Sequence, residues 1–337
     1  MGSKLLAKVS LQEKHLTYDI DRIITNITKM FIALNSKLKK RHVFAFVHDI
    51  FHEPQFDRRN SIENQYHNIY HTYEVVEMVA CIVSNTKLKN LLTPFERTIL
   101  LVAATCHDFG HNGISNTEWD DVSIKKQKAC ISSTSSLECL DMLYSDSWIS
   151  DDTNCSPGNS MRSTDECLLD GLNESKSYNE VMHFDLSMCT VLKHKKTILD
   201  NKSNTEISQL LSVMILETDL RRHEAYMKKY ENENTSPLDM MILVLKLSDI
   251  SHSMRPFRVH LQWVYSLVRE TRTRHIHRIH RKEVPTVEYM AFDTIRFGKK
   301  FVGDMLGIIV PLFPDFPPEL LANYDTNLKI WESYLLN

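Results

Sequence analysis

The chain has 337 residues, which is enough for one large helical domain or two ordinary ones. Its formal net charge of -3 gives no bulk attraction to nucleic acid or to an anionic membrane surface. The seven cysteines form no CxxC pair, which argues against a disulfide framework and against a cysteine-rich zinc module. Only 8 glycines and 10 prolines are present, so long helices are favoured over a turn-rich β fold.

The N-terminal segment indicates no targeting signal. The stretch MGSKLLAKVSLQEKH lacks a secretory apolar core, and Leu6 breaks the myristoylation pattern. The longest apolar run, 240–247, contains Lys246 and is soon followed by Asp249, so it is too short to span a bilayer. We therefore expect a cytoplasmic protein in a reducing compartment, with no membrane insertion.

Apolar residues recur at helical spacing along most of the chain. The first pattern covers residues 16 to about 47, and the second covers 68–84. A third begins with Thr93 as the cap, Pro94 at the first helical position and Glu96 as the acid of a capping box. Further helices are predicted over 207–218, 237–250, 258–269 and 301–312. No alternation typical of a sheet and no internal repeat is found, so the predicted fold class is all-α.

One segment, at about 117–179, differs in composition. It is rich in Ser, Thr, Asp and Asn and has weak periodicity, which is typical of a surface insertion. It carries four of the seven cysteines, whose spacing matches no metal knuckle, so we expect free exposed thiols. These cysteines are Cys130, Cys139, Cys155 and Cys167.

Two histidine pairs at a spacing of four suggest a metal site. On a helix, His67 and His71 would share one face, and so would His107 and His111. A single helical pair is more often a surface or core pair than a ligand pair. However, HDxxH at the end of a buried helix places an acid where burial without a partner is costly. A second acid, in LKLSDISH, ends another apolar helix, and imidazole and carboxylate groups are ligands of zinc and similar ions.

The motifs together resemble the catalytic domain of class I cyclic nucleotide phosphodiesterases. YHNIYH, HDFGHNGISN, ETDLRRH, SDISHSMRP and NLKIW occur in the family's order and rough spacing, from Tyr66 to the C-terminus. The family pattern HDxxHxGxxN is complete. The resemblance implies a single catalytic domain over residues 1–337, folded as a compact multi-helix bundle of the HD/phosphodiesterase type with a buried two-metal site.

The resemblance also implies roles for individual residues. His71, His107, Asp108 and Asp249 would bind the tighter metal, normally Zn²⁺. Asp108 would also reach a second ion, normally Mg²⁺ or Mn²⁺, which is otherwise held mostly by water. His67 would be the general acid that protonates the leaving 3′ oxygen.

Three further residues would support the metals. His111 would lie behind the direct ligands, and Glu180 and His183 loosely match a family element that contacts metal-bound water. Glu74, one turn after His71, could orient a ring, and a solvated acid is an equally open interpretation.

The chain departs from the family where the purine base is recognised. The family uses a glutamine, followed three residues later by a phenylalanine that stacks on the base. Counting back from NLKIW places Thr294 and Phe297 at these positions, whereas aligning on Pro311 places Phe301 and Asp304 there. We prefer the first register because it keeps the aromatic ring, and we add Tyr66 to the predicted substrate-binding residues.

A second departure follows Trp263, where the run RETRTRHIHRIHR replaces the family's phenylalanine pair and Gln-Gly-Asp stretch. We expect this run to be a solvated helix face.

The chemistry suits a cyclic phosphodiester, which is anionic and resists hydroxide. Two cations would neutralise the phosphate and supply hydroxide at neutral pH, while a histidine that is not a ligand would protonate the leaving group. The predicted function is hydrolysis of cAMP, cGMP or both to 5′-nucleoside monophosphates. Two alternatives remain open: an HD-type metal phosphohydrolase acting on another phosphate ester, and a non-catalytic nucleotide-binding relative.

The expected partner is a small cyclic nucleotide and not nucleic acid. The sequence allows a homodimer, and regulatory domains could lie outside this chain. The residues before Tyr66 are expected to be helices of the same domain.

Overall fold

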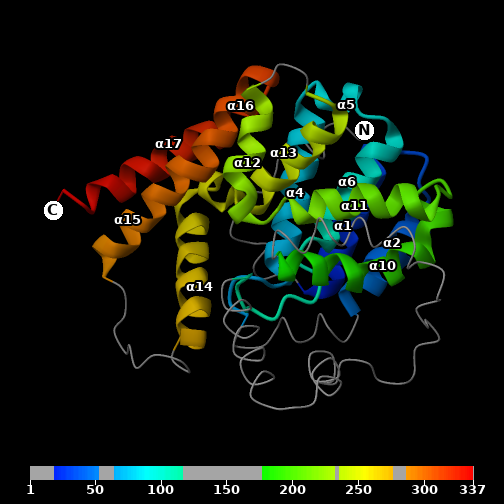
Figure 1. Cartoon of the computed structure of the whole chain (residues 1–337), viewed down its shortest axis with the longest axis horizontal. Coiled ribbons are helices and arrows are strands. Elements are labelled where there is room, and N and C mark those ends of the chain that lie inside the picture. Colours follow the sequence, from blue (N-terminus) through cyan, green and yellow to red (C-terminus); the bar gives the residue numbers. More distant parts are fainter. Residues whose placement is uncertain (1–18, 53–63, 117–176, 232–234, 276–285, 337) are drawn as a thin grey trace, which may run out of the picture.

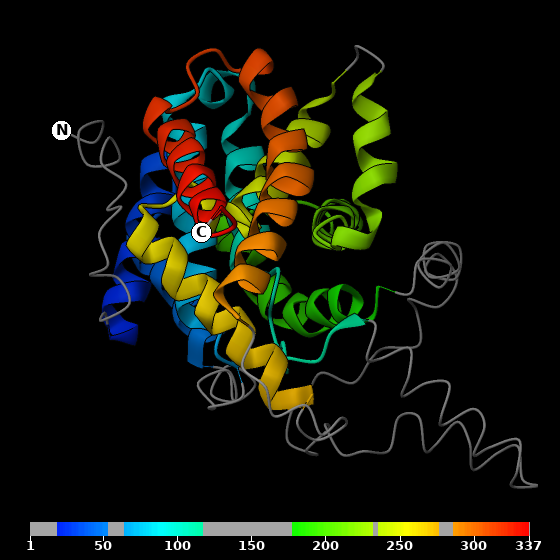
Figure 2. The same ribbon diagram turned by 90° about the vertical axis from the view of Figure 1, so that its left-hand side faces the viewer.

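The computed structural model describes residues 19–52, 64–116, 177–231, 235–275 and 286–336, which form helices and connecting loops with no β-strand among them. Figures 1 and 2 show the helices packed side by side as a bundle, with the C-terminal helices along one flank. The all-α prediction is confirmed for these parts. Most of the predicted insertion and its four cysteines lie outside the described residues, so that prediction and the single-domain prediction stay untested.

The first predicted helix is wrong as a single element, because the chain forms two helices there. Helix α1 (Ile20–Leu34) ends at Asn35, whose backbone is extended. The Asn35 side chain donates a hydrogen bond to Thr98 Oγ1 at 3.0 Å, which holds the turn against a neighbouring helix. Helix α2 (Lys40–His52) then packs back on α1. A long-range hydrogen bond therefore breaks a pattern that is continuous in the sequence.

Three buried helices form the centre of the bundle: α4 (Ile69–Asn85), α6 (Pro94–Cys106) and α13 (Pro237–Asp249). The predicted capping box of α6 is confirmed. Glu96 N donates to Thr93 Oγ1 at 3.2 Å, and Thr93 N donates to Glu96 Oε2 at 2.7 Å. These caps fix where each buried helix begins, so the residues at its ends come to defined positions.

Three helices of more than ten residues were missed: α10 (Tyr178–Ile198), α15 (Val287–Phe297) and α17 (Pro318–Ser333). Helix α10 is largely polar and buries only six of its residues, so its apolar periodicity is weak. The short helices α5 and α12 were not predicted either. Helices α11, α14 and α16 were predicted with shifted ends. The bounds of the helices named in the last two sentences are α5 (Leu88–Leu91), α11 (Asn204–Leu216), α12 (His223–Met227), α14 (Phe257–His275) and α16 (Asp304–Leu312).

Helix α16 begins later than predicted because Gly298–Gly303 forms a π-helical segment, η6, between α15 and α16. Helices α15 and α17 pack on each other, and α17 also contacts α14 and the short 3₁₀ segment η5 (Ser251–Met254) that follows α13 (Figure 1). Among the described helices, none combines the length and apolar character needed to cross a bilayer.

Candidate metal and catalytic site

The candidate ligands come from the ends of the three central helices. Asp249 is the last residue of α13, His107 caps the C-terminal end of α6 and is followed by Asp108, and His71 lies in the first turn of α4. Asn68 starts α4, because its side-chain oxygen accepts hydrogen bonds from Tyr70 N at 3.0 Å and from His71 N at 3.2 Å. Helix ends thus bring residues distant in sequence to one place.

The prediction that the two members of each histidine pair share one helix face is wrong. Helix α4 begins at Ile69, so His67 precedes it, and α6 ends before His107, so His111 lies beyond it. Between His107 and His111, Gly110 has a φ of 76°, a left-handed conformation that ends the helical path. Tertiary packing, and not helical spacing, therefore positions these rings.

One group of side chains, which we call the cation cluster, comprises His71, His107, Asp108 and Asp249. Asp249 Oδ1 lies 3.1 Å from His71 Nε2 and 3.3 Å from His107 Nε2. Asp108 Oδ2 lies 3.4 Å from each of the same two nitrogens. The two imidazoles are almost fully buried. Two imidazole nitrogens and two carboxylate oxygens thus converge on one point.

The donor set of the cation cluster fits a divalent cation. His107 Nδ1 donates to Ala104 O at 2.9 Å, which leaves a lone pair on Nε2 facing the carboxylates. His107 Nε2 and Asp108 Oδ2 are both buried and make no hydrogen bond within the described residues. Lone pairs that face each other in a buried site repel unless a positive charge lies between them, so the arrangement suits a bound metal ion.

Electrostatics lead to the same conclusion. Burial by itself would lower the pKa of His107, yet the charges of Asp108 and Asp249 raise it to about 9. Burial would raise the pKa of both carboxyl groups, but the neighbouring histidines hold it below the usual value. The cluster therefore stabilises a positive charge at its centre, which a metal ion would provide.

Asp108 also faces a second group. Its Oδ1 lies 3.8 Å from His183 Nε2, and the ligand atoms of Asp108, His111 and His183 lie within 4.8 Å of one another. His183 Nδ1 donates to Phe109 O at 2.6 Å, so its Nε2 carries a lone pair as well. The two oxygens of one carboxylate thus point at two neighbouring groups of candidate ligands.

Glu180, in the first turn of α10, borders this second group. Its carboxylate accepts a hydrogen bond from Asn116 Nδ2 at 2.8 Å, and Asn116 Oδ1 accepts from Asn179 N at 2.9 Å. Burial, followed by the charge of Asp219, raises the pKa of Glu180 to about 7. A carboxyl group that is poised to hold or release a proton near neutral pH therefore lies beside the candidate metal site.

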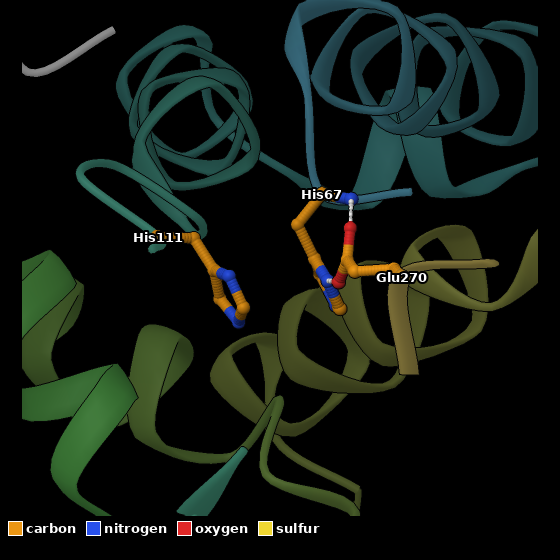
Figure 3. A group of neighbouring side chains, drawn as sticks. All are labelled: His67, His111 and Glu270. Atoms are coloured by element: carbon orange, nitrogen blue, oxygen red, sulfur yellow. Dashed lines mark hydrogen bonds and ion pairs between the residues drawn. The ribbon is translucent and has the colours of Figure 1, made fainter. Parts of the chain in front are cut away.

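His67 makes a two-point contact with Glu270 of α14 (Figure 3). His67 Nδ1 hydrogen-bonds Glu270 Oε1, while Glu270 Oε2 accepts from His67 N at 3.0 Å and from Tyr66 N at 2.7 Å. The His67 ring stacks on His111 with centroids 3.9 Å apart. Burial would lower the pKa of His67, but Glu270 raises it to about 9 through its charge and its hydrogen bond. His67 is therefore held protonated and oriented beside the two groups of candidate metal ligands.

Glu270 was missed by sequence reasoning, and the expectation that its charge run is a solvated face is wrong at this position. Glu270 is only 3% exposed, because its carboxylate reaches three donors on the segment before α4. A signal was present: Glu270 lies seven residues after the buried Trp263, two helical turns along the same face of α14.

Glu74 is buried, so its interpretation as a solvated acid is wrong. Its supporting role stays a prediction. Arg255, which is fully buried, places Nε 3.7 Å from Glu74 Oε2 and donates from Nη2 to Glu74 O at 3.1 Å. Arg255 Nη1 also donates to Glu77 Oε2 at 2.7 Å. This ion-pair network braces α4 directly behind His71.

A cavity of about 350 Å³ opens over the site. His67 and Glu270 line one side, and Leu267 and Arg221 contribute to its wall. Further lining residues from the predicted site are Asp108, His111, Glu180, His183 and Asp249.

The three predicted substrate-binding residues do not line this cavity. Tyr66 is buried, with its ring centroid 4.8 Å from that of His71. Phe297 lies at the end of α15 with its ring 6.4 Å from that of His252, and Thr294 lies one turn earlier. Their substrate-binding roles stay predictions.

Comparison with known proteins places the site in a family context. A family model described as 3′5′-cyclic nucleotide phosphodiesterase matches residues 66–138 and 164–317. The chain is 26% identical over 215 residues to cGMP-specific 3′,5′-cGMP phosphodiesterase 3 of Dictyostelium discoideum, covering 61% of this chain and 38% of that protein. It is 22% identical over 284 residues to the high affinity cGMP-specific 3′,5′-cyclic phosphodiesterase 9A of Mus musculus, covering 81% of this chain and 45% of that protein.

Among solved structures, the phosphodiesterase domain of Salpingoeca rosetta rhodopsin phosphodiesterase has the same fold, with a TM-score of 0.68 at 18% identity. The match covers 99% of this chain and 94% of that domain. The chain spans less than half the length of the two curated relatives.

Proposed function

This chain belongs to the 3′,5′-cyclic nucleotide phosphodiesterase family, and on that premise we propose that it hydrolyses cAMP, cGMP or both to 5′-nucleoside monophosphates. One observation carries the proposal. Asp108 directs its two carboxylate oxygens at two adjacent groups of candidate ligands, and the His67–Glu270 pair lies beside them. The names of the relatives agree, since each is a cyclic nucleotide phosphodiesterase.

We propose that the cation cluster holds Zn²⁺ and that Asp108 also reaches a second ion, Mg²⁺ or Mn²⁺. The nitrogen ligands of the cluster favour zinc, whereas a site with one carboxylate and otherwise mostly water suits the harder ions. His111, Glu180 and His183 would orient the water around the second ion. When bound, the two ions neutralise the phosphate and make a nucleophile available at neutral pH.

His67 would supply the proton that the leaving group needs. In the reaction, water adds to phosphorus, the P–O3′ bond breaks, and the 3′ oxygen leaves with the bonding electron pair. Glu270 occupies His67 Nδ1, so His67 Nε2 is the atom that would deliver a proton to this oxygen. The proton lost by the attacking water then reprotonates His67, so the side chain ends the reaction in the state in which it began.

The experiment is hydrolysis of cAMP and cGMP by the purified chain with Mg²⁺ or Mn²⁺, together with the measured metal content. We expect turnover of at least one nucleotide that is lost on chelation and restored by adding metal. A protein that retains zinc and hydrolyses neither nucleotide would contradict the proposal.

A second candidate is hydrolysis of another phosphate ester by the same metal chemistry. It is favoured by one observation: neither Thr294 nor Phe297 lines the cavity over the candidate metal site. A panel of phosphate mono- and diesters, assayed beside the cyclic nucleotides, separates the two. A non-nucleotide ester that is hydrolysed faster than cAMP and cGMP would favour the second candidate.

A further inference from the structure

Two turns that are far apart in the sequence meet at the N-terminal end of α6. In the turn between α1 and α2, Asn35 Nδ2 donates a hydrogen bond to Pro94 O at 3.3 Å. In the turn between α10 and α11, Lys202 Nζ lies 4.8 Å from the centroid of the Phe95 ring. Pro94 and Phe95 are the first two residues of α6, so both turns lie at this end of the bundle.

Helix α5 lies at the same end of the bundle. Arg97, in the first turn of α6, donates from Nε to Leu34 O at 2.7 Å and from Nη1 to Leu92 O at 2.7 Å and to Lys89 O. One guanidinium group therefore ties the end of α1 and the end of α5 to the start of α6. We call the surface formed by residues 36–41, 86–97 and 195–206 the basic end.

Cationic side chains greatly outnumber acids at the basic end. Its three segments contain ten Lys and Arg residues and only three acids, although the formal net charge of the whole chain is -3. Two of the acids are already engaged, since Glu96 Oε2 accepts from Thr93 N at 2.7 Å and Glu206 Oε1 pairs with Lys202 Nζ at 2.8 Å. The basic end thus carries a local charge opposite in sign to that of the molecule.

The turn between α1 and α2 presents the densest group of these cations. Lys37, Lys39, Lys40 and Arg41 are all exposed, and none of the three lysines forms an ion pair with the described residues. No Asp or Glu occurs in the sequence between Asp21 and Asp49. These four side chains therefore lie in solvent without an acid nearby in the sequence to neutralise them.

The basic end faces away from the candidate metal site. Helix α6 has 13 residues and ends just before His107, so the site lies about 20 Å from the basic end at 1.5 Å per residue. Helix α10 shows the same polarity, because Glu180 in its first turn lines the cavity and Lys195 lies in its last turn. Salt screens charges beyond about 8 Å at physiological ionic strength. An approaching surface therefore meets the cations of the basic end and not the net charge of the chain.

The kind of cation and its neighbours indicate the partner. Eight of the ten cations are Lys, whose flexible point charge suits a fluid surface better than the geometric readout for which Arg is used. Leu91, on α5, is 49% exposed, and no aromatic side chain is exposed among the described residues of the basic end. Nucleic-acid sites use guanidinium groups and stacked aromatic rings. Lysines around an apolar side chain fit an anionic bilayer surface instead.

We propose that the basic end docks on an anionic lipid bilayer. Lys37, Lys39, Lys40 and Arg41 supply most of the attraction, and Leu91 rests in the headgroup region. The binding is peripheral and reversible, and it requires no helix that crosses the membrane. Because the cavity lies at the opposite ends of α6 and α10, it stays open to substrate while the protein is docked. The inference goes beyond the proposed function and does not depend on it.

The test is co-sedimentation of the purified chain with lipid vesicles. We expect binding to phosphatidylcholine vesicles that contain about 30% phosphatidylserine, no binding to phosphatidylcholine alone, and loss of binding between about 0.1 M and about 0.5 M NaCl. The quadruple variant Lys37→Gln/Lys39→Gln/Lys40→Gln/Arg41→Gln should lower the partition coefficient at least about 100-fold, since each cation near such a surface contributes about fivefold.

A matched control removes the same charge elsewhere. The quadruple variant Lys228→Gln/Lys229→Gln/Arg296→Gln/Lys329→Gln changes four exposed cations outside the basic end and should keep vesicle binding within about twofold. Both quadruple variants should unfold at the temperature of the unmodified protein and keep its rate of hydrolysis in the absence of vesicles. A failure of the proposed function is therefore distinguishable from a failure of docking.

Three results would overturn the inference. The first is no binding of the unmodified protein to the phosphatidylserine vesicles. The second is an equal loss of binding in the two quadruple variants, because net charge and not the basic end would then control it. The third is displacement from the vesicles by a short DNA duplex at a concentration of phosphate below that of the lipid, which would make nucleic acid the partner.

Discussion

The cation cluster and a second group, the imidazole relay of Trp331, His260 and His252, are both buried and rich in histidine, yet their polar atoms are arranged in opposite ways. In the cation cluster, His107 Nε2 and Asp108 Oδ2 face each other with no hydrogen bond. In the relay, Trp331 Nε1 donates to His260 Nε2 at 2.8 Å, and His260 Nδ1 lies 3.0 Å from His252 Nδ1, so each of these ring nitrogens is paired. The first arrangement needs a cation to be stable, and the second is complete without one.

The difference separates a group suited to metal binding from one that supports the fold. The cation cluster draws on residues that match the family motifs, so any substrate with the right phosphate would meet the same metal chemistry. The relay joins η5, α14 and α17, and its residues His252 and Trp331 also lie in family motifs, SDISHSMRP and NLKIW. Changes in the cluster should slow cAMP and cGMP hydrolysis by the same factor, whereas changes in the relay should chiefly lower the stability of the fold, because they leave buried polar atoms unpaired.

The largest effect is expected from Asp108→Ala. Loss of the carboxylate that faces both ligand groups should lower kcat/KM for both nucleotides by about 10³-fold or more, because several kcal/mol of charge stabilisation is lost. Steady-state kinetics and metal analysis measure the effect. Asp325→Ala, an exposed acid on α17, is the control. A loss confined to one nucleotide would contradict a role for Asp108 in metal chemistry that is common to both.

The second largest effect is expected from His67→Ala, which should lower kcat about 10²- to 10⁴-fold for both nucleotides and leave the metal content unchanged. The loss should shrink strongly for an activated diester such as bis(p-nitrophenyl) phosphate, because its leaving group needs no proton. An equal loss with the activated diester would mean that His67 acts by some means other than proton donation.

Glu270→Gln tests the electrostatic support of His67. Glu270 raises the pKa of His67 to about 9, so the proton-donating form persists up to that pH and activity should fall above it. Without the carboxylate the pKa of His67 drops, so the alkaline limb of the kcat profile should move to lower pH. Glu288→Gln, at an exposed position on α15, should leave the limb in place. If the alkaline limb of the kcat profile does not move in Glu270→Gln, Glu270 does not set the pKa of His67.

The smallest effects are expected from the helix caps. Asn68→Ala and Thr93→Ala each remove a side-chain cap and should lower the free energy of unfolding by about 1 kcal/mol, measured by denaturant titration. Only Asn68→Ala should also lower activity, since Asn68 fixes the turn that carries His71. Equal activities in the two variants would show that this cap serves stability alone.

The sequence by itself determined the all-α class, the buried central helices and the capping box at Thr93. These features depend on local periodicity and on hydrogen bonds between residues three apart. The motifs also identified the four residues of the cation cluster and their neighbours His67, His111, Glu180 and His183. The structure brings these side chains together, while the individual roles stay predictions.

Only the tertiary structure decided how the rings reach one another. The histidine pairs share no helix face, because Asn68 and Gly110 redirect the chain between their members. The buried position of Glu270 depends on three donors that lie more than 200 residues earlier. The imidazole relay joins three separate helical segments. Apart from the spacing of Glu270 from Trp263, no local sign of these contacts is present in the sequence, because burial and hydrogen bonding between distant segments are set by packing and not by the spacing of neighbouring residues.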